Sequence, residues 1–353
     1  MLAGRAPCTA TVPVMGAESF GESSRGPVRL LRIGAEPGPV LDVLDLGATV
    51  HRLWVTGGDG VRRNVVLGHA TAEEHLESAD YIGGTIGRYA NRIRDGRFPL
   101  DGDTVQVETN DRGNTLHGGP DGFDRRMWEV DHHTDDRLVL SLGSPGGDQG
   151  FPGELVAVVA FEATGDSVRV HLEATCDAPT VVNLTSHAYF NLDGDSTGPV
   201  DAQWLRVAAD AYLPVADDGI PLDVQPVAGT PFDLREAVRL GDVVAATGGL
   251  DHNYLLTGAG PSAVLDSPGT RTRLELTTDQ PGLQVYSGIG FDGTRRSTTG
   301  EPYLQGAGLA LEPQRFPDTP NRPDFGSAVL RPGETYSAGI EWRFSALPED
   351  RGV

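Results

Sequence analysis

The chain has 353 residues and a formal net charge of −22, and all 28 of its basic residues are arginine. A field of this sign repels nucleic acid and anionic membranes, so a small neutral molecule is the expected partner. No apolar run is long enough to span a bilayer, and the two cysteines, Cys8 and Cys176, form no disulfide framework, so a cytoplasmic location is expected.

The N-terminal stretch shows no structural pattern. It has one arginine and no sustained apolar core, which argues against a signal peptide, and Met15 offers an alternative start. We predict a disordered tail at 1–18 and one domain at 19–350, existing as a monomer or a homodimer.

From Val28 onward, short strand patterns alternate with turns rich in the 47 glycines and 25 prolines of the chain. No segment resembles a β-α-β unit, so we predict an all-β fold, a large antiparallel β-sandwich with a few short helices. The predicted strands are 28–33, 39–46, 48–55, 104–109, 137–142, 155–163, 167–176, 203–209, 272–278, 282–288, 308–312 and 335–347.

Two short segments are predicted as helical. Residues 71–78 have Thr71 as a candidate N-cap and acidic residues in the first turn. A second helical turn is predicted at 233–240.

Two polar segments lie in the first third of the chain. Residues 83–93 combine glycines with Arg88, Asn91 and Arg92, whose fixed donors suit sugar hydroxyls. Residues 114–119 place His117 before two glycines. A glycine-rich turn with solvated arginines explains the first pattern equally well, and a lone histidine such as His117 is more often structural or solvated than functional.

The segment Asn183–Leu192 alternates with period two. Asn183, Thr185, His187, Tyr189 and Asn191 share one side, and apolar or small residues share the other. A row of uncharged polar groups is costly to bury without partners. We therefore interpret this segment as a strand whose polar side faces a ligand.

Three candidates follow in the last third of the chain. Asp251 opens the polar cluster 251–254, which is equally consistent with a turn that opens a strand. Gln284 and Tyr286 share one strand face. Glu312 ends an apolar run, where burial would raise its pKa and make it a better base, although a solvent-exposed glutamate is the alternative.

Other motifs are rejected on their context. The GxGxxG at 288–293 is not followed by an apolar helix, and the GxSxG at 194–198 is followed directly by Pro199. The nine histidines show no HxH or HExxH spacing, so no metal site is expected.

The segments GRYANRI, TLHGG, GFDRRMW, FPGEL, NLTSHAYFNL, AYLPV, GTPFDLR, DHNYLL, QPGLQVYSG and LEPQRFPDTPN occur in this order. Together they resemble the aldose 1-epimerase (galactose mutarotase) family from about residue 20 to residue 347. The resemblance implies a large antiparallel β-sandwich with the sugar cleft on one sheet. Ser186 and Pro313 depart from residues common in the family, and these departures bear on sugar preference.

The resemblance also implies roles for individual residues. His187 matches the catalytic acid and Glu312 the catalytic base. The residues matched to sugar binding are Asn91, Arg92, His117, Tyr189, Asp251 and Gln284.

The implied reaction interconverts the α and β anomers of a free hexose such as galactose or glucose. Glu312 would remove the O1 proton while His187 protonates the ring oxygen, and no cofactor is needed. This scheme predicts a bell-shaped pH profile, with Glu312 on the acidic limb and His187 on the basic limb. The alternatives are a glycosidase or lyase, a non-catalytic sugar-binding module, and a hexose 6-phosphate epimerase served by Arg88, Arg92 and Arg94.

Overall fold

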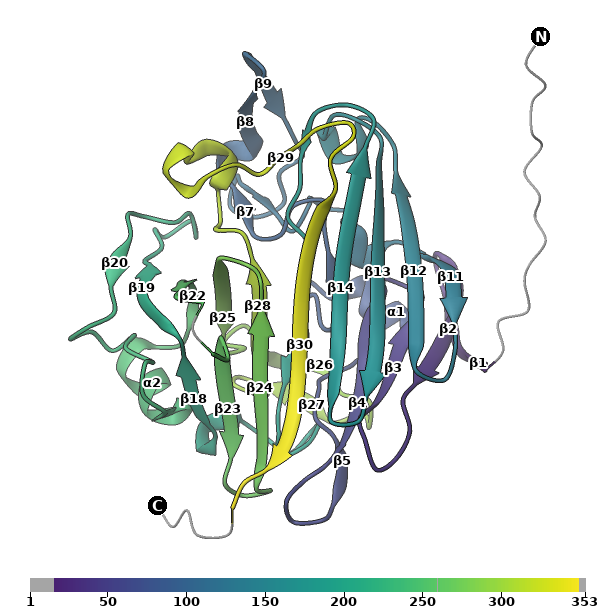
Figure 1. Ribbon diagram of the computed structural model, residues 1–353, viewed down its shortest axis with the longest axis vertical. Coiled ribbons are helices and arrows are strands. Elements are labelled where there is room, and N and C mark those ends of the chain that lie inside the picture. The colour runs from purple at the N-terminus through teal and green to yellow at the C-terminus, as the bar shows by residue number, and fades with distance from the viewer. Residues whose placement is uncertain (1–15, 259, 349–353) are drawn as a thin grey trace.

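Strands dominate the computed structural model, which describes residues 16–258 and 260–348 (Figure 1). The largest sheet has nine strands, in the order β11-β12-β13-β14-β30-β24-β23-β18-β21. In this order the strands span Glu129–His133, Arg137–Ser144, Leu155–Thr164, Ser167–Cys176, Tyr336–Ala346, Thr272–Thr278, Ala263–Ser267, Trp204–Val207 and Val238–Arg239.

Two further sheets have five and six strands. The five-stranded sheet contains β1 (Ala17–Ser23), β2 (Gly26–Ile33), β3 (Val40–Leu44), β4 (Thr49–Thr56) and β5 (Arg62–Asn64). The six-stranded sheet runs β17 (Tyr189–Phe190), β28 (Leu309–Gln314), β25 (Gly282–Tyr286), β22 (Asp251–Leu256), β19 (Ala209–Leu213) and β20 (Gln225–Pro226).

Short two-stranded pairs complete the strand inventory of the described residues. They are β6 (Thr85–Ile86) with β16 (Thr185–Ser186), β7 (Arg92–Ile93) with β10 (Thr115–Leu116), β8 (Arg97–Leu100) with β9 (Asp103–Gln106), β15 (Thr180–Val181) with β29 (Val329–Leu330), and β26 (Asp292–Arg296) with β27 (Pro302–Leu304).

One hydrophobic core lies between the nine-stranded sheet and the other two large sheets. It joins Leu31 of β2, Leu172 of β14 and Leu283 of β25 in a single cluster of buried side chains. Trp342 of β30 is fully buried and meets the ring of Phe190 at 5.4 Å between centroids. The sequence-based prediction of an antiparallel β-sandwich is therefore confirmed.

The first predicted helix is confirmed and the second is wrong. Helix α1 spans Ala72–Glu77, and Thr71 forms a capping box with Glu74. Residues 238–239 instead pair with β18 at the edge of the large sheet, and helix α2 begins only at Leu240 and ends at Thr247. Edge pairing outweighs the helical pattern there.

Most predicted strands differ from the structure by a few residues at their ends, and two differences affect how the sheets are built. Strand β1 begins at Ala17, which pairs with Leu31, so ordered structure starts before residue 19, whereas residues 1–15 lie outside the described part of the chain. The predicted strand 203–209 breaks at Ala208, whose N–H donates to Ser262 and whose carbonyl accepts from Thr257. The chain passes there from the nine-stranded sheet to the six-stranded sheet.

The segment 183–192 is buried throughout but is not one continuous strand. It forms the short strands β16 and β17, which pair with different neighbours. Asn183 and Asn191 do not face a ligand, because their side-chain amides donate to backbone carbonyls, at Ala90 and Ala307 among others. The prediction of a ligand-facing polar row is therefore wrong for these two residues.

Among the described residues, no helix has the length and apolar character needed to cross a membrane.

Candidate active site

A pocket of ≈150 Å³ lies on the face of the six-stranded sheet that points away from the core. The alternation of β25 creates this face: Leu283 and Val285 belong to the core, whereas Gln284 and Tyr286 line the pocket. All eight residues that the family resemblance matched to catalysis or sugar binding lie in its wall. The lining residues are Ala79, Asp80, Tyr81, Asn91, Arg92, Leu116, His117, His187, Tyr189, Asp251, Gln284, Tyr286 and Glu312.

A larger hollow of ≈420 Å³ lies on the outer face of the nine-stranded sheet. Its charged side chains include the ion pairs Arg137–Glu162 at 3.0 Å and Arg169–Glu341 at 3.1 Å. Because these charges are already paired on an open surface, the chemistry is better sought in the smaller pocket.

Glu312 and His187 form a buried acid–base pair in this pocket. Glu312 Oε1 lies 3.5 Å from His187 Nε2, and the two residues are only 1% and 4% exposed. Strand β28 holds Glu312 in register with Gln284. His187 is fixed by its backbone, since its N–H donates to Gly84 and its carbonyl accepts from Gly83.

Burial shifts both members of the pair toward their neutral forms. It raises the pKa of Glu312 well above its ordinary value, with a further contribution from the Asp251 carboxylate, and it lowers the pKa of His187 to about 4. At a pH between these two pKa values the pair therefore holds one proton, on Glu312, and the two groups titrate as a unit. This reverses the predicted limbs: proton uptake by His187 belongs to the acidic limb and proton loss from Glu312 to the basic limb.

His117 is locked into one tautomer by Asn91. The backbone N–H of Asn91 donates to His117 Nδ1 at 3.1 Å. The backbone N–H of His117 donates in return to the Asn91 carbonyl at 3.1 Å. Because Nδ1 is an acceptor, the neutral ring carries its proton on Nε2. Burial, together with His187 and Arg92, keeps the pKa of His117 well below its ordinary value, so it acts as a neutral donor.

The same tautomer argues against a metal centre. Donor atoms of His117, His187 and Glu312 lie within 4.8 Å of one another, which is a metal-like spacing that no sequence motif indicated. A metal-bound histidine donates its other ring N–H to an acceptor. In His117 the other nitrogen faces the N–H donor of Asn91, so this residue fits the role of ligand poorly.

Arg92 and Asp251 reach the pocket with fixed orientations. The Arg92 Nε donates to Asp111 at 2.8 Å, and its side chain is 9% exposed. Gln284 Nε2 donates to Asp251 Oδ1 at 2.7 Å. Gln284 Oε1 is buried and has no protein partner in the part of the chain that the structure describes, so it remains an acceptor for a hydroxyl group.

Aromatic rings complete the pocket, and sequence reasoning assigned a role to only one of them. The Tyr189 hydroxyl donates to the Asp80 carbonyl at 3.0 Å, and its ring lies 4.9 Å from that of His187. Tyr286 shares the pocket face of β25, as its spacing indicated, but no role was assigned to it. Tyr81 was missed, because its position after α1 carries no periodic signal.

Arg88 does not belong to the pocket. It is 2% exposed, and its guanidinium donates to Ser144 and to the carbonyls of Pro152 and Gly153. The sequence-based suggestion that Arg88 offers donors to a sugar is therefore wrong, since its N–H groups hold two loops together.

Comparisons with known proteins agree with one another. The aldose 1-epimerase family model matches residues 29–343. The chain is 40% identical over 334 residues to the aldose 1-epimerase of Escherichia coli K12, covering 91% of this chain and 96% of that protein. It is 38% identical over 334 residues to the galactose mutarotase of Rattus norvegicus, with coverage of 92% and 97%.

Solved structures give the same result. The GalM/aldose epimerase homologue from C. elegans superposes with a TM-score of 0.86 at 31% identity, covering 90% of this chain and 99% of that one. Galactose 1-epimerase from Lactobacillus acidophilus superposes with a TM-score of 0.83 at 29% identity, with coverage of 94% and 98%.

Proposed function

This chain belongs to the aldose 1-epimerase family, and from that premise we propose that its Glu312 and His187 interconvert the α and β anomers of a free aldohexose. The observation that carries the proposal is the 3.5 Å approach of a buried carboxylate and a buried imidazole in one pocket. Such a pair can exchange protons with two oxygens of one small molecule.

Ring opening moves two protons. Glu312 accepts the O1 proton as the C1–O1 bond becomes a carbonyl, and the C1–O5 bond breaks as His187 protonates O5. After rotation about the C1–C2 bond, His187 takes the O5 proton back, O5 attacks the other face of C1, and Glu312 returns a proton to O1. Each group ends the cycle in its starting state.

The one-proton form of the pair is the competent form. In the free enzyme, burial places this proton on Glu312. Ring opening starts when the proton lies on His187, and the open-chain sugar meets the neutral pair again. The short distance between Oε1 and Nε2 supports this exchange.

Two fixed donors, one neutral and one cationic, support the oxygens as charge shifts. The His117 Nε2–H and the Arg92 guanidinium are suited to O5 or O1, because both are fixed before the sugar binds. Asp251 and Gln284 are suited to ring hydroxyls, since their mutual hydrogen bond orients both acceptors. Asn91 supports this set through His117, and Tyr189 through its contact with His187.

The three arginines considered for a hexose 6-phosphate are all engaged. Arg88 lies outside the pocket, Arg92 pairs with Asp111, and Arg94 pairs with the buried Asp318 at 3.8 Å. This alternative is therefore not favoured. A glycosidase is also not favoured, because Asp251, its second candidate carboxylate, accepts a hydrogen bond from Gln284. A non-catalytic binding module is not favoured either, because it would not require the buried Glu312–His187 pair.

Polarimetry tests the proposal. The optical rotation of fresh α-glucose, α-galactose and α-glucose 6-phosphate is followed with and without protein. We expect catalysed decay for at least one free hexose and little or none for the phosphate. Decay of all three sugars at the spontaneous rate would contradict the proposal.

A cytoplasmic location, a monomeric or homodimeric state, and the lack of nucleic-acid or membrane partners stay predictions from composition. The buried, acid-rich pocket supports a neutral sugar as the partner.

A further inference from the structure

Three aromatic rings surround the imidazole of His187. Tyr189 lies 4.9 Å away between centroids at an interplanar angle of 32°, and Tyr81 stacks at 5.9 Å and 26°. His117 meets it edge-on at 5.2 Å and 77°. The Tyr81 ring is therefore stacked on the imidazole and the Tyr189 ring is tilted against it, and both lie within the range of a cation–π contact.

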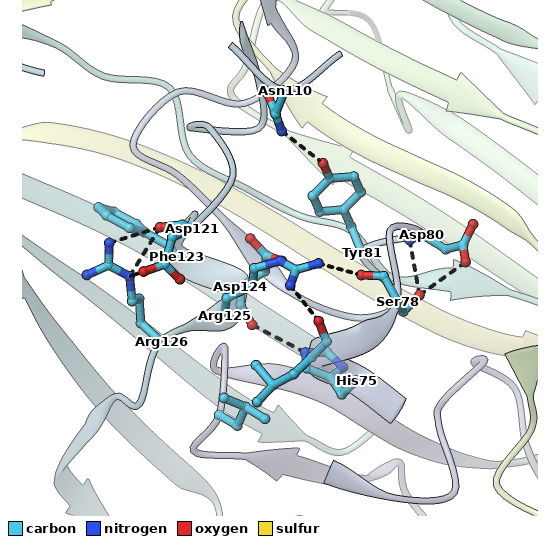
Figure 2. Close-up of polar contacts among 12 residues, drawn as sticks. His75, Ser78, Asp80, Tyr81, Asn110, Asp121, Phe123, Asp124, Arg125 and Arg126 are labelled. Atoms are coloured by element: carbon cyan, nitrogen blue, oxygen red, sulfur yellow. Dashed lines mark hydrogen bonds and ion pairs between the residues drawn. The ribbon is translucent and has the colours of Figure 1, made fainter. Parts of the chain in front are cut away.

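The position of Tyr81 is fixed at both ends of its side chain. Its φ of 55° places the backbone in the left-handed region. Its hydroxyl accepts from Asn110 Nδ2 at 3.5 Å (Figure 2). The adjacent Asp80 carbonyl accepts the Tyr189 hydroxyl at 3.0 Å, which couples the two tyrosines.

Arg125 ties the turn before Tyr81 to the body of the protein. Its guanidinium donates to the carbonyl of Ser78 at 2.7 Å and to that of Leu76 at the end of α1 (Figure 2). His75 of the same helix contacts the Asp124 carbonyl through Nε2 at 3.3 Å. The turn is thus held by contacts outside the pocket, and Tyr81 is presented to His187 in one orientation.

A buried imidazolium needs compensation that water cannot supply. The titratable groups that face His187 are Glu312, His117, Tyr81 and Tyr189. Glu312 offers a negative charge only before it takes the sugar proton, and His117 is a donor. The faces of the two tyrosine rings are the remaining groups with a negative potential.

We propose that Tyr81 is a positioning residue that, together with Tyr189, stabilises the protonated imidazole of His187 through the face of its ring. This inference rests on the proposed function and adds to it the means by which a buried histidine accepts a proton. Tyr81 acts through His187 rather than on the sugar, although a role as a stacking platform for the sugar is the obvious competing explanation.

The two explanations separate in a fluorination series. Position 81 is replaced by phenylalanine and then by its mono-, di- and trifluorinated forms, which keep the ring shape and progressively weaken its negative face. Tyr81→Phe should retain most activity, since the hydroxyl lies outside the ring contact. From Phe to trifluoro-Phe we expect kcat to fall stepwise by about 3- to 30-fold, with KM nearly constant.

The same series at Phe291 is the matched control. This ring packs against Tyr189 at 5.2 Å and 52° but is not among the residues that line the pocket. No graded loss of kcat is expected there. A constant kcat across the series at position 81 would overturn the proposal, and so would a rising KM at constant kcat, which would make Tyr81 a sugar platform.

A second measurement does not depend on catalysis. The protonation of His187 is followed by nitrogen NMR of the sugar-free protein along the same series. We expect the pKa of His187 to fall with each fluorine. If the protein fails to mutarotate but this trend appears, the ring contact stands and the proposed function fails. If mutarotation proceeds and the pKa stays constant, the proposal about Tyr81 is wrong.

Discussion

The pocket has one wall of regular strands and one wall of loops, and the two walls fix their side chains differently. In the strand wall, Asp251, Gln284 and Glu312 stand on the neighbouring strands β22, β25 and β28, whose ladder sets their spacing. In the loop wall, Tyr81, Asn91 and His117 all have left-handed backbones, with φ of 55°, 63° and 52°.

This difference shows where strain is stored. A non-glycine residue in the left-handed region costs about 1–3 kcal/mol and persists only when its surroundings hold it. The reciprocal hydrogen bonds between Asn91 and His117 do so in the loop wall. The strands have regular backbone conformations and need no such compensation. The strand wall therefore holds its side chains without backbone strain, whereas the loop wall orients its side chains at a cost in backbone free energy.

The largest expected effect comes from the strand wall. Glu312→Gln keeps the shape of the side chain but cannot accept the O1 proton, so kcat should fall by more than about 10²-fold with KM nearly unchanged. Steady-state polarimetry measures both constants. Glu301→Gln, at an exposed position, is the control and should match the wild type. A Glu312→Gln variant with wild-type kcat would remove Glu312 from the chemical step.

Asp251→Ala tests whether the strand wall divides into a chemical part and a binding part. An ionised acceptor bound to a hydroxyl contributes about 1.5–3 kcal/mol, so KM should rise by about 10- to 150-fold. Discrimination between glucose and galactose should flatten, because the lost partner no longer distinguishes them. A steep fall in kcat with unchanged KM would instead place Asp251 in the proton transfers.

Gly118→Ala tests how tightly the loop wall is packed beside His117. The residue has φ of +87°, and an added Cβ would lie 2.1 Å from the Gly87 carbonyl oxygen, next to His117. Gly113 has φ of +86° with nothing within 4 Å, so Gly113→Ala isolates the backbone cost from the clash. In urea unfolding, Gly118→Ala should lose about 1–3 kcal/mol more than Gly113→Ala. Equal losses of unfolding free energy in the two variants would show that the loop rearranges to accommodate the added methyl group.

These walls were not equally predictable. The period-two alternation and the apolar run placed Gln284 and Glu312 on strands, as the structure has them. Residues such as His117 and Asn91 depended on the family resemblance, because a left-handed backbone leaves no periodic pattern in a sequence. Tyr81 had neither signal. Its place depends on Arg125 and Asn110, which are distant contacts that only the folded chain brings together.

Errors had the same origin. The polar side of 183–192 was interpreted as one ligand-facing row. The side-chain amides of Asn183 and Asn191 instead donate hydrogen bonds to backbone carbonyls of neighbouring loops. Arg88 resembled a sugar donor but closes a buried junction. In each case a polar residue near the motif satisfies the backbone of a neighbouring loop, and local sequence does not reveal that loop.

Acid should also separate the two walls. Burial lowers the pKa of His51 and His69 to about 3 and that of His75 to about 4. Since these folded-state pKa values lie below the unfolded value of about 6.5, the stability they contribute is complete above pH 6.5 and is lost as pH falls toward 3, by up to about 1.4 kcal/mol per pH unit for each residue.

His75 lies in α1, beneath the turn that carries Tyr81, and its ring meets that of His69 at 5.9 Å. On lowering the pH from 7 to 5, amide hydrogen exchange should accelerate more in residues 78–84 than in β25 and β28, after correction for intrinsic rates. His75→Gln, which cannot titrate, should reduce the difference. Equal acceleration in both walls would contradict the claim that acid destabilises the loop wall more than the strand wall.

The pH–rate profile of the wild-type enzyme tests most directly whether Glu312 and His187 share one proton. Values of kcat/KM for α-hexose mutarotation are measured by pH-jump polarimetry from pH 3.5 to 10, with recovery at pH 7 confirming that the enzyme stays intact. We predict a bell. Its acidic limb lies near pH 4, where His187 takes up a second proton, and its basic limb lies where Glu312, with its raised pKa, loses the shared one. A profile that is flat across this range, with chemistry limiting the rate, would contradict the shared-proton pair.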